Sequence, residues 1–184
     1  MIVTIDAALD IAGPVVQKVG ASDMHAPTPC SDWDVHQLLN HMLYELAWVP
    51  ELLSGKTIAQ VGDSLDGDLI GKDLQHTWHV YAKTVQAAAE QSPPEKVVHL
   101  SYGNVPASQY VAEVAGDIVI HTWDLAKGIG MDFRIPEDVA KAIFQSIHAH
   151  IGDWRAKGLV GDEVTVPADA SAEARLLGLF GRKA

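Results

Sequence analysis

Cysteine, clusters of positive charge and long apolar runs are scarce or missing in this sequence. Cys30 is the single cysteine among 184 residues, so no disulfide can form within the chain, and a reducing cytosol is the compartment we expect. Thirteen lysines and arginines stand against 24 aspartates and glutamates, giving a net charge of −11. The basic residues form no cluster, which disfavours binding to nucleic acid or to an anionic membrane surface.

No apolar run approaches the roughly 20 residues that a helix needs to cross a bilayer. Residues 1–20 lack the basic start of a signal peptide and carry Asp6 and Asp10 within an apolar pattern, which predicts an amphipathic helix. The sequence has no internal repeat, and 48% of its residues are hydrophobic against 20% charged. We therefore expect a cytoplasmic protein with a single globular domain over residues 1–184.

Apolar residues recur at helical spacing along most of the chain. The periodicity predicts helices at about 5–20, 34–55, 73–91, 106–127 and 136–158. Asp34 and Gln37 stand in the spacing of a capping box, which gives the second helix a clear start. The glycine-rich residues 54–72 form a connection long enough for a crossover within a bundle.

Turn-forming residues delimit the fourth helix. Residues 96–108 predict a short extended piece, then a helix with Asn104 as its cap and Pro106 in its first turn. Gly128 and Gly130 are expected to end this helix. Residues 159–184 predict a short strand and a small helix. The fold class is therefore an all-α bundle with an extra helix and a short C-terminal appendage.

The fourth predicted helix carries a polar stripe, "GDIVIHTWDLAKG", at residues 116–128. Asp117, His121 and Asp124 follow one another at intervals of four and three, which places them on one helical face. Val114, Ile118 and Leu125 lie beside that face, so the stripe is at the edge of the core. A buried carboxylate costs several kcal/mol unless it is paired or bound to a cation.

A divalent metal ion is one way to remove that cost. Asp117 and His121 would supply two ligands, and His41, which lies among apolar neighbours on the second helix, is the best third ligand. Two imidazoles and one carboxylate leave coordination positions for water or substrate. The alternative is a hydrogen-bonded Asp117–His121 pair without an ion. His76 and His79 form a second pair by spacing, but we expect them on a solvated flank.

Two segments together resemble a known family. "APTPCSDWDVHQLLNHM" (26–42) and "DIVIHTWDLAKGIG" (117–130) are similar to the actinobacterial DinB-like family related to the N-terminal domain of mycothiol-dependent maleylpyruvate isomerase. The closing "VPADASAEARLLGLFGR" (166–182) also resembles the tail of that group. The resemblance implies a four-helix bundle with a long crossover after the second helix. It also implies a metal site at His41, Asp117 and His121, with Glu as the usual family residue at the position of Asp117.

The resemblance further implies an activity. Better-studied relatives couple a low-molecular-weight thiol to isomerisation or S-transfer, so we expect a metal- and mycothiol-dependent transferase or isomerase. Zn²⁺ is the expected metal from the N and O ligands, with Ni²⁺ as another candidate. Asp124 is expected to orient His121 or the end of its helix, and the alternative is a structural hydrogen bond or a cap partner. A small-molecule thiol and a substrate would be the partners, and a homodimer is compatible with such bundles. The alternatives are a non-catalytic bundle with a structural, sensory or vacant site, and a metal-dependent hydrolase.

Overall fold

The computed structural model describes residues 2–148, 151–158, 160–167 and 169–183. Thr4–Met131 form one compact unit, and the described residues 2–3 and 132–183 belong to a second. The two units are described separately below, and a single domain over 1–184 stays a prediction. Among the described residues, no helix is long and apolar enough to span a membrane.

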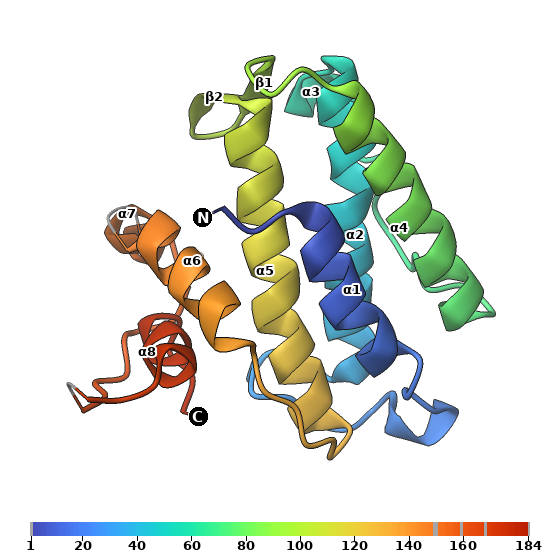
Figure 1. Ribbon diagram of the computed structural model, residues 1–184. Helices are drawn as coiled ribbons and strands as arrows, with labels where there is room; N and C mark the ends of the chain where they lie inside the picture. Colours follow the sequence, from blue (N-terminus) through green and yellow to red (C-terminus); the bar gives the residue numbers. More distant parts are fainter. Residues whose placement is uncertain (1, 149–150, 159, 168, 184) are drawn as a thin grey trace. The chain divides into compact units, whose positions relative to one another are not determined.

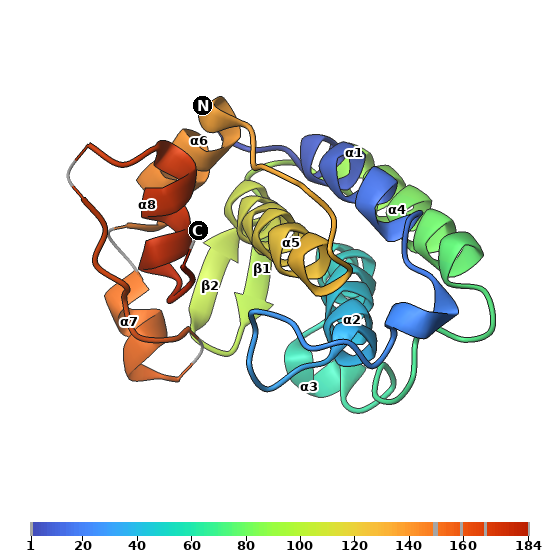
Figure 2. The same cartoon turned by 90° about the horizontal axis from the view of Figure 1, so that it is seen from below.

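The first unit is a four-helix bundle, which confirms the predicted all-α fold class (Figure 1). Its long helices are α1 (Ile5–Val16), α2 (Val35–Ser54), α4 (Leu74–Gln91) and α5 (Ala107–Gly128). α1 and α2 each pack against both α4 and α5, and Figure 2 shows this arrangement along the helix axes. The interior is filled by fully buried side chains, among them Leu38, Leu39, Met42, Leu43, Ile118 and Leu125.

The capping box predicted for α2 is confirmed. The Asp34 side chain accepts a hydrogen bond of 2.9 Å from the Gln37 backbone N–H, and the Gln37 side chain accepts one of 3.0 Å from the Asp34 backbone N–H. These two bonds satisfy amides that a helix start leaves without partners. They fix the helix start seven residues before His41.

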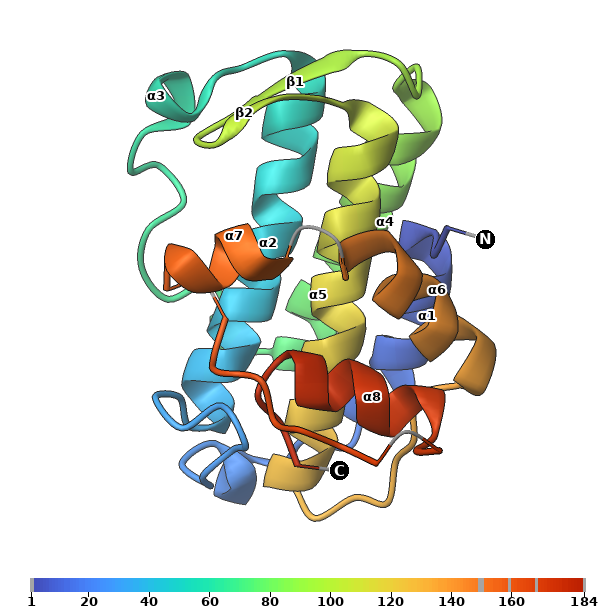
Figure 3. The same cartoon turned by 90° about the vertical axis from the view of Figure 1, so that its left-hand side faces the viewer.

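The predicted crossover after α2 is also confirmed. Residues 55–73 contain the short helix α3 (Ile58–Val61) and return along the bundle, so α2 and α4 run in the same direction (Figure 3). Asn40 on α2 holds the returning segment with both ends of its amide. Its Nδ2 donates to the Gly67 carbonyl at 2.9 Å, and its Oδ1 accepts from the Leu69 N–H at 2.7 Å.

A β-hairpin connects α4 to α5, and here the predicted cap is wrong. β1 (Val97–Leu100) and β2 (Gly103–Pro106) pair antiparallel. Asn104 lies within β2 opposite His99, and its Oδ1 is 2.8 Å from the His99 Nδ1. Because strand pairing continues through Pro106, that residue is the N-cap of α5 rather than part of its first turn.

The end of α5 follows the prediction at Gly130 but not at Gly128. Gly130 has a φ of +68°, the left-handed conformation that glycine adopts most readily after a helix. Gly128 lies inside the last turn. A Cβ there would lie 3.0 Å from the Val35 Cγ2 and 3.1 Å from the Thr28 Cγ2, so Gly128 allows α5 to approach the loop before α2.

The second unit contains α6 (Glu137–Ile147), α7 (Ile151–Ala156) and α8 (Ala172–Leu179), with α6 packed against α8. The predicted helix at 136–158 covers α6 and α7, but its residues 149 and 150 lie outside the described residues. The small C-terminal helix is confirmed as α8. The strand predicted before it is not found in the described residues 160–167, because the Val164 N–H donates to the Gly178 carbonyl at 2.8 Å rather than to a strand.

Candidate metal centre

α2 and α5 bring together the three residues that the sequence singled out as metal ligands. His41 comes from α2, and Asp117 and His121 come from consecutive turns of α5. One ligand atom of each side chain lies within 4.8 Å of the others. We call His41, Asp117 and His121 the triad. Its role in binding metal stays a prediction.

Asp117 lies between the two imidazoles of the triad. Its Oδ2 is 3.3 Å from the His41 Nε2, and its Oδ1 is 3.4 Å from the His121 Nε2. Among the described residues, the His41 Nε2 and the Asp117 Oδ2 are buried atoms that make no hydrogen bond. Buried polar atoms rarely remain unsatisfied, because each loses its hydration without compensation. A cation between these atoms would provide that compensation.

Two of the separations within the triad, each from a different Asp117 oxygen, are close to those expected around a small divalent ion. An ion with tetrahedral ligands at about 2.1 Å sets neighbouring ligand atoms about 3.4 Å apart. The two separations between Asp117 oxygens and imidazole nitrogens are 3.3 and 3.4 Å. The Asp117 carboxylate therefore reaches both imidazoles although it is one methylene shorter than a glutamate.

Asp124 holds the other side of the His121 ring. Its Oδ2 lies 3.0 Å from the His121 Nδ1, and the Asp124 side chain is completely buried. Since Nδ1–H donates to Asp124, Nε2 is the nitrogen that faces Asp117. A carboxylate behind a histidine in this way fixes the ring and raises its basicity, as is usual for metal-binding histidines.

The pKa values of Asp117 and His121 show how strongly the triad is coupled. Burial alone would raise the pKa of Asp117, but the His121 and His41 imidazoles outweigh it and hold this pKa well below its usual range. Burial alone would lower the pKa of His121, but Asp117 and Asp124 outweigh it and raise this pKa to about 9. Without an ion, the triad therefore contains a carboxylate and at least one imidazolium at neutral pH.

A second group of ionisable residues comprises Glu45, one turn after His41 on α2, Tyr110, two turns before Asp117 on α5, and Tyr102 in the turn between β1 and β2. Burial, with a further contribution from Asp117, raises the pKa of Glu45 on α2 to about 7. Burial also raises the pKa of Tyr110 and that of Tyr102, whose hydroxyl donates a hydrogen bond to Glu113. The sequence alone predicts no role for these residues. The only signal was the interval of four residues between His41 and Glu45.

Trp33 covers the imidazoles and was also missed by the sequence analysis. Its ring centroid is 4.4 Å from that of His41 and 5.6 Å from that of His121, and the two imidazoles are 4.9 Å apart with their planes at 80°. Trp33 immediately precedes the N-cap of α2, and nothing in the spacing indicates where its side chain points. The indole limits the directions from which a ligand can approach the triad.

The loop before α2 holds Trp33 in place through backbone hydrogen bonds. The Thr28 hydroxyl donates to the Trp33 carbonyl at 2.7 Å and lies 3.1 Å from the Cys30 carbonyl. The Trp33 N–H donates to the Cys30 carbonyl at 2.9 Å, and the Val35 N–H donates to the Ala26 carbonyl at 3.0 Å. Trp33 therefore lies on a closed loop, and Gly128 at the end of α5 packs against this loop.

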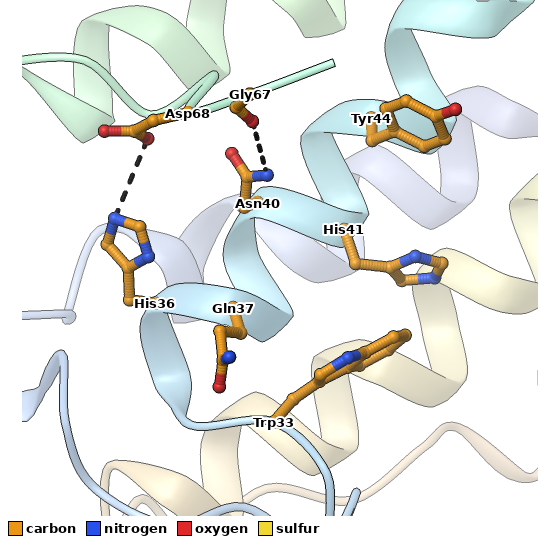
Figure 4. Close-up of a pocket in the computed structure, with 8 residues that line it drawn as sticks. All are labelled: Trp33, His36, Gln37, Asn40, His41, Tyr44, Gly67 and Asp68. Atoms are coloured by element: carbon orange, nitrogen blue, oxygen red, sulfur yellow. Dashed lines mark hydrogen bonds and ion pairs between the residues drawn. The ribbon is translucent and has the colours of Figure 1, made fainter. Parts of the chain in front are cut away.

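A pocket of about 410 Å³ opens beside the triad. It lies between α2 and the crossover, and it is lined by Trp33, His36, Gln37, Asn40, His41, Tyr44, Gly67 and Asp68. In Figure 4, the rings of Trp33 and His41 lie next to each other, while His36 and Asn40 point toward Asp68 and Gly67. His41 therefore belongs both to the triad and to the pocket wall. His76 and His79, the second pair noted in the sequence, are exposed on α4 as expected.

The sequence of the bundle matches a known protein family. The family model described as the mycothiol maleylpyruvate isomerase N-terminal domain matches residues 6–126. The chain is also similar to two proteins from two strains of Mycobacterium tuberculosis, called uncharacterized protein MT0763 and uncharacterized protein Rv0738. Each is 23% identical to this chain over 177 residues, which are 95% of this chain and 93% of the relative. The search of solved structures found no match.

The family match spans the bundle from the first turn of α1 to the last turn of α5, and it includes His41, Asp117, His121 and Asp124. It thus covers the part of the chain that builds the triad. This chain belongs to the family of the mycothiol maleylpyruvate isomerase N-terminal domain.

Proposed function

We propose that this protein binds one divalent metal ion at His41, Asp117 and His121 and uses it in a thiol-dependent transfer or isomerisation reaction. The observation that carries the proposal is the triad itself, in which three ligand atoms converge and two buried polar atoms lack hydrogen bonds. Zn²⁺ suits two imidazole nitrogens and one carboxylate, and Ni²⁺ is the second candidate. Membership of the family supports mycothiol as the thiol.

The ion would supply acidity, because a coordinated thiol is deprotonated at neutral pH. The chain's own residues prepare the site for this chemistry. Asp124 keeps the His121 Nε2 directed at Asp117, and Trp33 closes one side of the imidazole pair. Three protein ligands leave room for at least one further ligand, which is typical of catalytic rather than structural sites.

Glu45 is the residue best suited to accept the proton that the thiol releases. It is largely buried one turn after His41, and its pKa of about 7 allows it to change protonation near neutral pH. Tyr102 and Tyr110 lie close enough to Glu45 for their pKa values to be raised by it as well as by burial. Glu45 would hold the proton on its carboxylate until a substrate atom takes it.

The test is to load the purified chain with Co²⁺ and add mycothiol. Coordination of a thiolate gives a sulfur-to-cobalt charge-transfer absorption in the near ultraviolet, and we expect this band to saturate at one thiol per chain. Glu45→Gln should keep the Co²⁺ and shift the formation of the band to higher pH.

The competing functions predict different results. A metal-dependent hydrolase would bind Co²⁺ but show no charge-transfer band with the thiol. A non-catalytic bundle would show neither an open coordination position nor any response to the thiol. Either result would overturn the thiol-dependent function.

A further inference from the structure

Hydrogen bonds within the protein hold part of the wall of the pocket beside the triad in place. The Gln37 Oε1 accepts from Asp34 in the capping box, and both ends of the Asn40 amide bond the crossover backbone. The Asn40 amide and the Gln37 oxygen are therefore used within the fold. Ligand selection in the pocket therefore depends mainly on its rings and its charged rim.

The rings form one side of the pocket. The Trp33 indole lies 4.4 Å from the His41 imidazole with the two planes tilted by 32°, and Tyr44 lines the pocket one turn further along α2. Aromatic surfaces stabilise a second ring stacked on them beyond the gain from burial alone. The volume of about 410 Å³ is in the range of small-molecule sites.

The charged groups form the opposite rim. His36 Nε2 lies 3.7 Å from Asp68 Oδ1, and both side chains are partly exposed. Among the residues that line the pocket in the described part of the chain, none is lysine or arginine. Beyond His41, the next charged group is the Asp117 carboxylate. An anionic ligand would thus meet the Asp68 carboxylate at the rim and find only histidines as cationic partners: His36 already faces Asp68, and the His121 imidazolium is paired with Asp117 and Asp124.

We propose that this pocket binds the organic body of the molecule that reacts at the triad, and that it selects a ring-bearing body which is neutral or positively charged. The reacting atom would lie on the His41 side and the body between Trp33 and Asp68. The identity of the reacting group rests on the proposed function, whereas binding of the body does not require an ion.

The experiment uses the full chain without metal and follows two probes by ¹H–¹⁵N NMR. Benzyl alcohol is a neutral ring, and 4-(hydroxymethyl)benzoate is the same ring with a carboxylate. We expect benzyl alcohol to shift the Trp33 indole N–H and the Asn40 side-chain amide. We also expect it to bind about two- to fivefold more tightly than the benzoate, the factor that one exposed charge interaction provides.

Two variants separate the contributions of the ring and of the charge. Trp33→Leu keeps an apolar side chain but removes the stacking surface, so benzyl alcohol should bind several-fold more weakly. Asp68→Asn lies on the exposed rim and should leave benzyl alcohol binding unchanged while tightening benzoate binding. His79→Ala, an exposed change on α4, is the control and should alter neither probe.

Shifts confined to residues outside the pocket would overturn the proposal, as would equal or tighter binding of the benzoate. The metal content of the same preparation is measured separately. A chain that binds metal but not benzyl alcohol refutes the pocket proposal alone. A chain that binds benzyl alcohol in the pocket but no metal refutes the proposed function alone.

Discussion

At the scale of single residues, Asp124 fixes the orientation of the His121 ring and raises its basicity. It is fully buried, and its carboxylate lies 3.0 Å from the His121 Nδ1. Asp124→Asn keeps an oxygen that can accept this hydrogen bond but removes the negative charge. We expect metal affinity to fall about 10- to 100-fold, the usual cost of changing such a partner. Competition with a chromophoric chelator measures the affinity, and an unchanged affinity would show that the negative charge of Asp124 does not contribute to metal binding.

The pKa of His121 predicts opposite pH dependences with and without metal. In the metal-free protein this pKa is raised from 6.5 to about 9, so folding favours the protonated ring. The stabilising effect is complete below about pH 6.5 and is lost as the pH rises through about 9. His121→Gln cannot gain a proton, so the stability difference between the wild type and this variant should be largest at pH 6 and shrink toward pH 10. Chemical denaturation at several pH values measures it.

Metal binding must displace the proton that the His121 imidazolium carries in the metal-free protein. One proton should therefore be released for each ion bound, and affinity for the ion should fall about tenfold for each pH unit below pH 9. Isothermal titration in buffers of different ionisation enthalpy counts the protons. If no proton is released at pH 7, His121 is not a ligand in the predicted form.

The residues of the triad could be found from spacing, but their surroundings could not. Intervals of four and three placed Asp117, His121 and Asp124 on one face, and apolar neighbours pointed His41 toward the core. Trp33 was missed because its position depends on a hydrogen bond that Thr28 donates to its carbonyl and one that its own N–H donates to the Cys30 carbonyl, within an irregular loop. No periodic pattern encodes such contacts.

At the scale of elements, α5 approaches the loop before α2 so closely that little space is left for a side chain at position 128. Gly128→Ala would place a Cβ 3.0 Å from the Val35 Cγ2 and 3.1 Å from the Thr28 Cγ2. We expect this change to destabilise the protein by about 1–3 kcal/mol, the usual cost of overpacking. Denaturant unfolding measures the change in free energy.

Gly13→Ala is the matched control, because it lies inside α1 and its new Cβ would be 4.0 Å from the Trp78 Nε1, an ordinary van der Waals contact. The gain in helix propensity from Ala is opposed by the restriction that Pro14 places on the residue before it, so the free energy of unfolding should change by less than about 1 kcal/mol. Equal effects of the two substitutions would mean that the contact between Gly128 and the loop is not tight in solution.

The helices could be predicted because periodicity and caps are local properties. Asp34 with Gln37 defined the start of α2, and the length of residues 54–72 allowed the crossover. The hairpin was only partly foreseen, since four-residue strands depend on their partner. For the same reason Asn104 became a strand residue rather than a helix cap, and the strand expected in residues 160–167 did not find a partner among the described residues.

At the scale of the whole molecule, the candidate site belongs to one unit of the chain. The triad, Asp124, Trp33 and the pocket all lie within residues 4–131. The family match at 6–126 covers nearly the same residues. The net charge of −11 gives the molecule an overall attraction for cations, so loosely bound metal must be separated from metal held at the triad.

The most direct test of the account is therefore the metal content of the chain purified without a histidine tag and dialysed against a weak chelator. Elemental analysis should find about one divalent ion per chain in the wild type and in His79→Ala, whose histidine is exposed on α4. His41→Ala and His121→Ala should each lose most of it. Full metal occupancy in His121→Ala, or no metal in the wild type even after incubation with Zn²⁺ or Ni²⁺, would contradict the assignment of His41, Asp117 and His121 as a metal site.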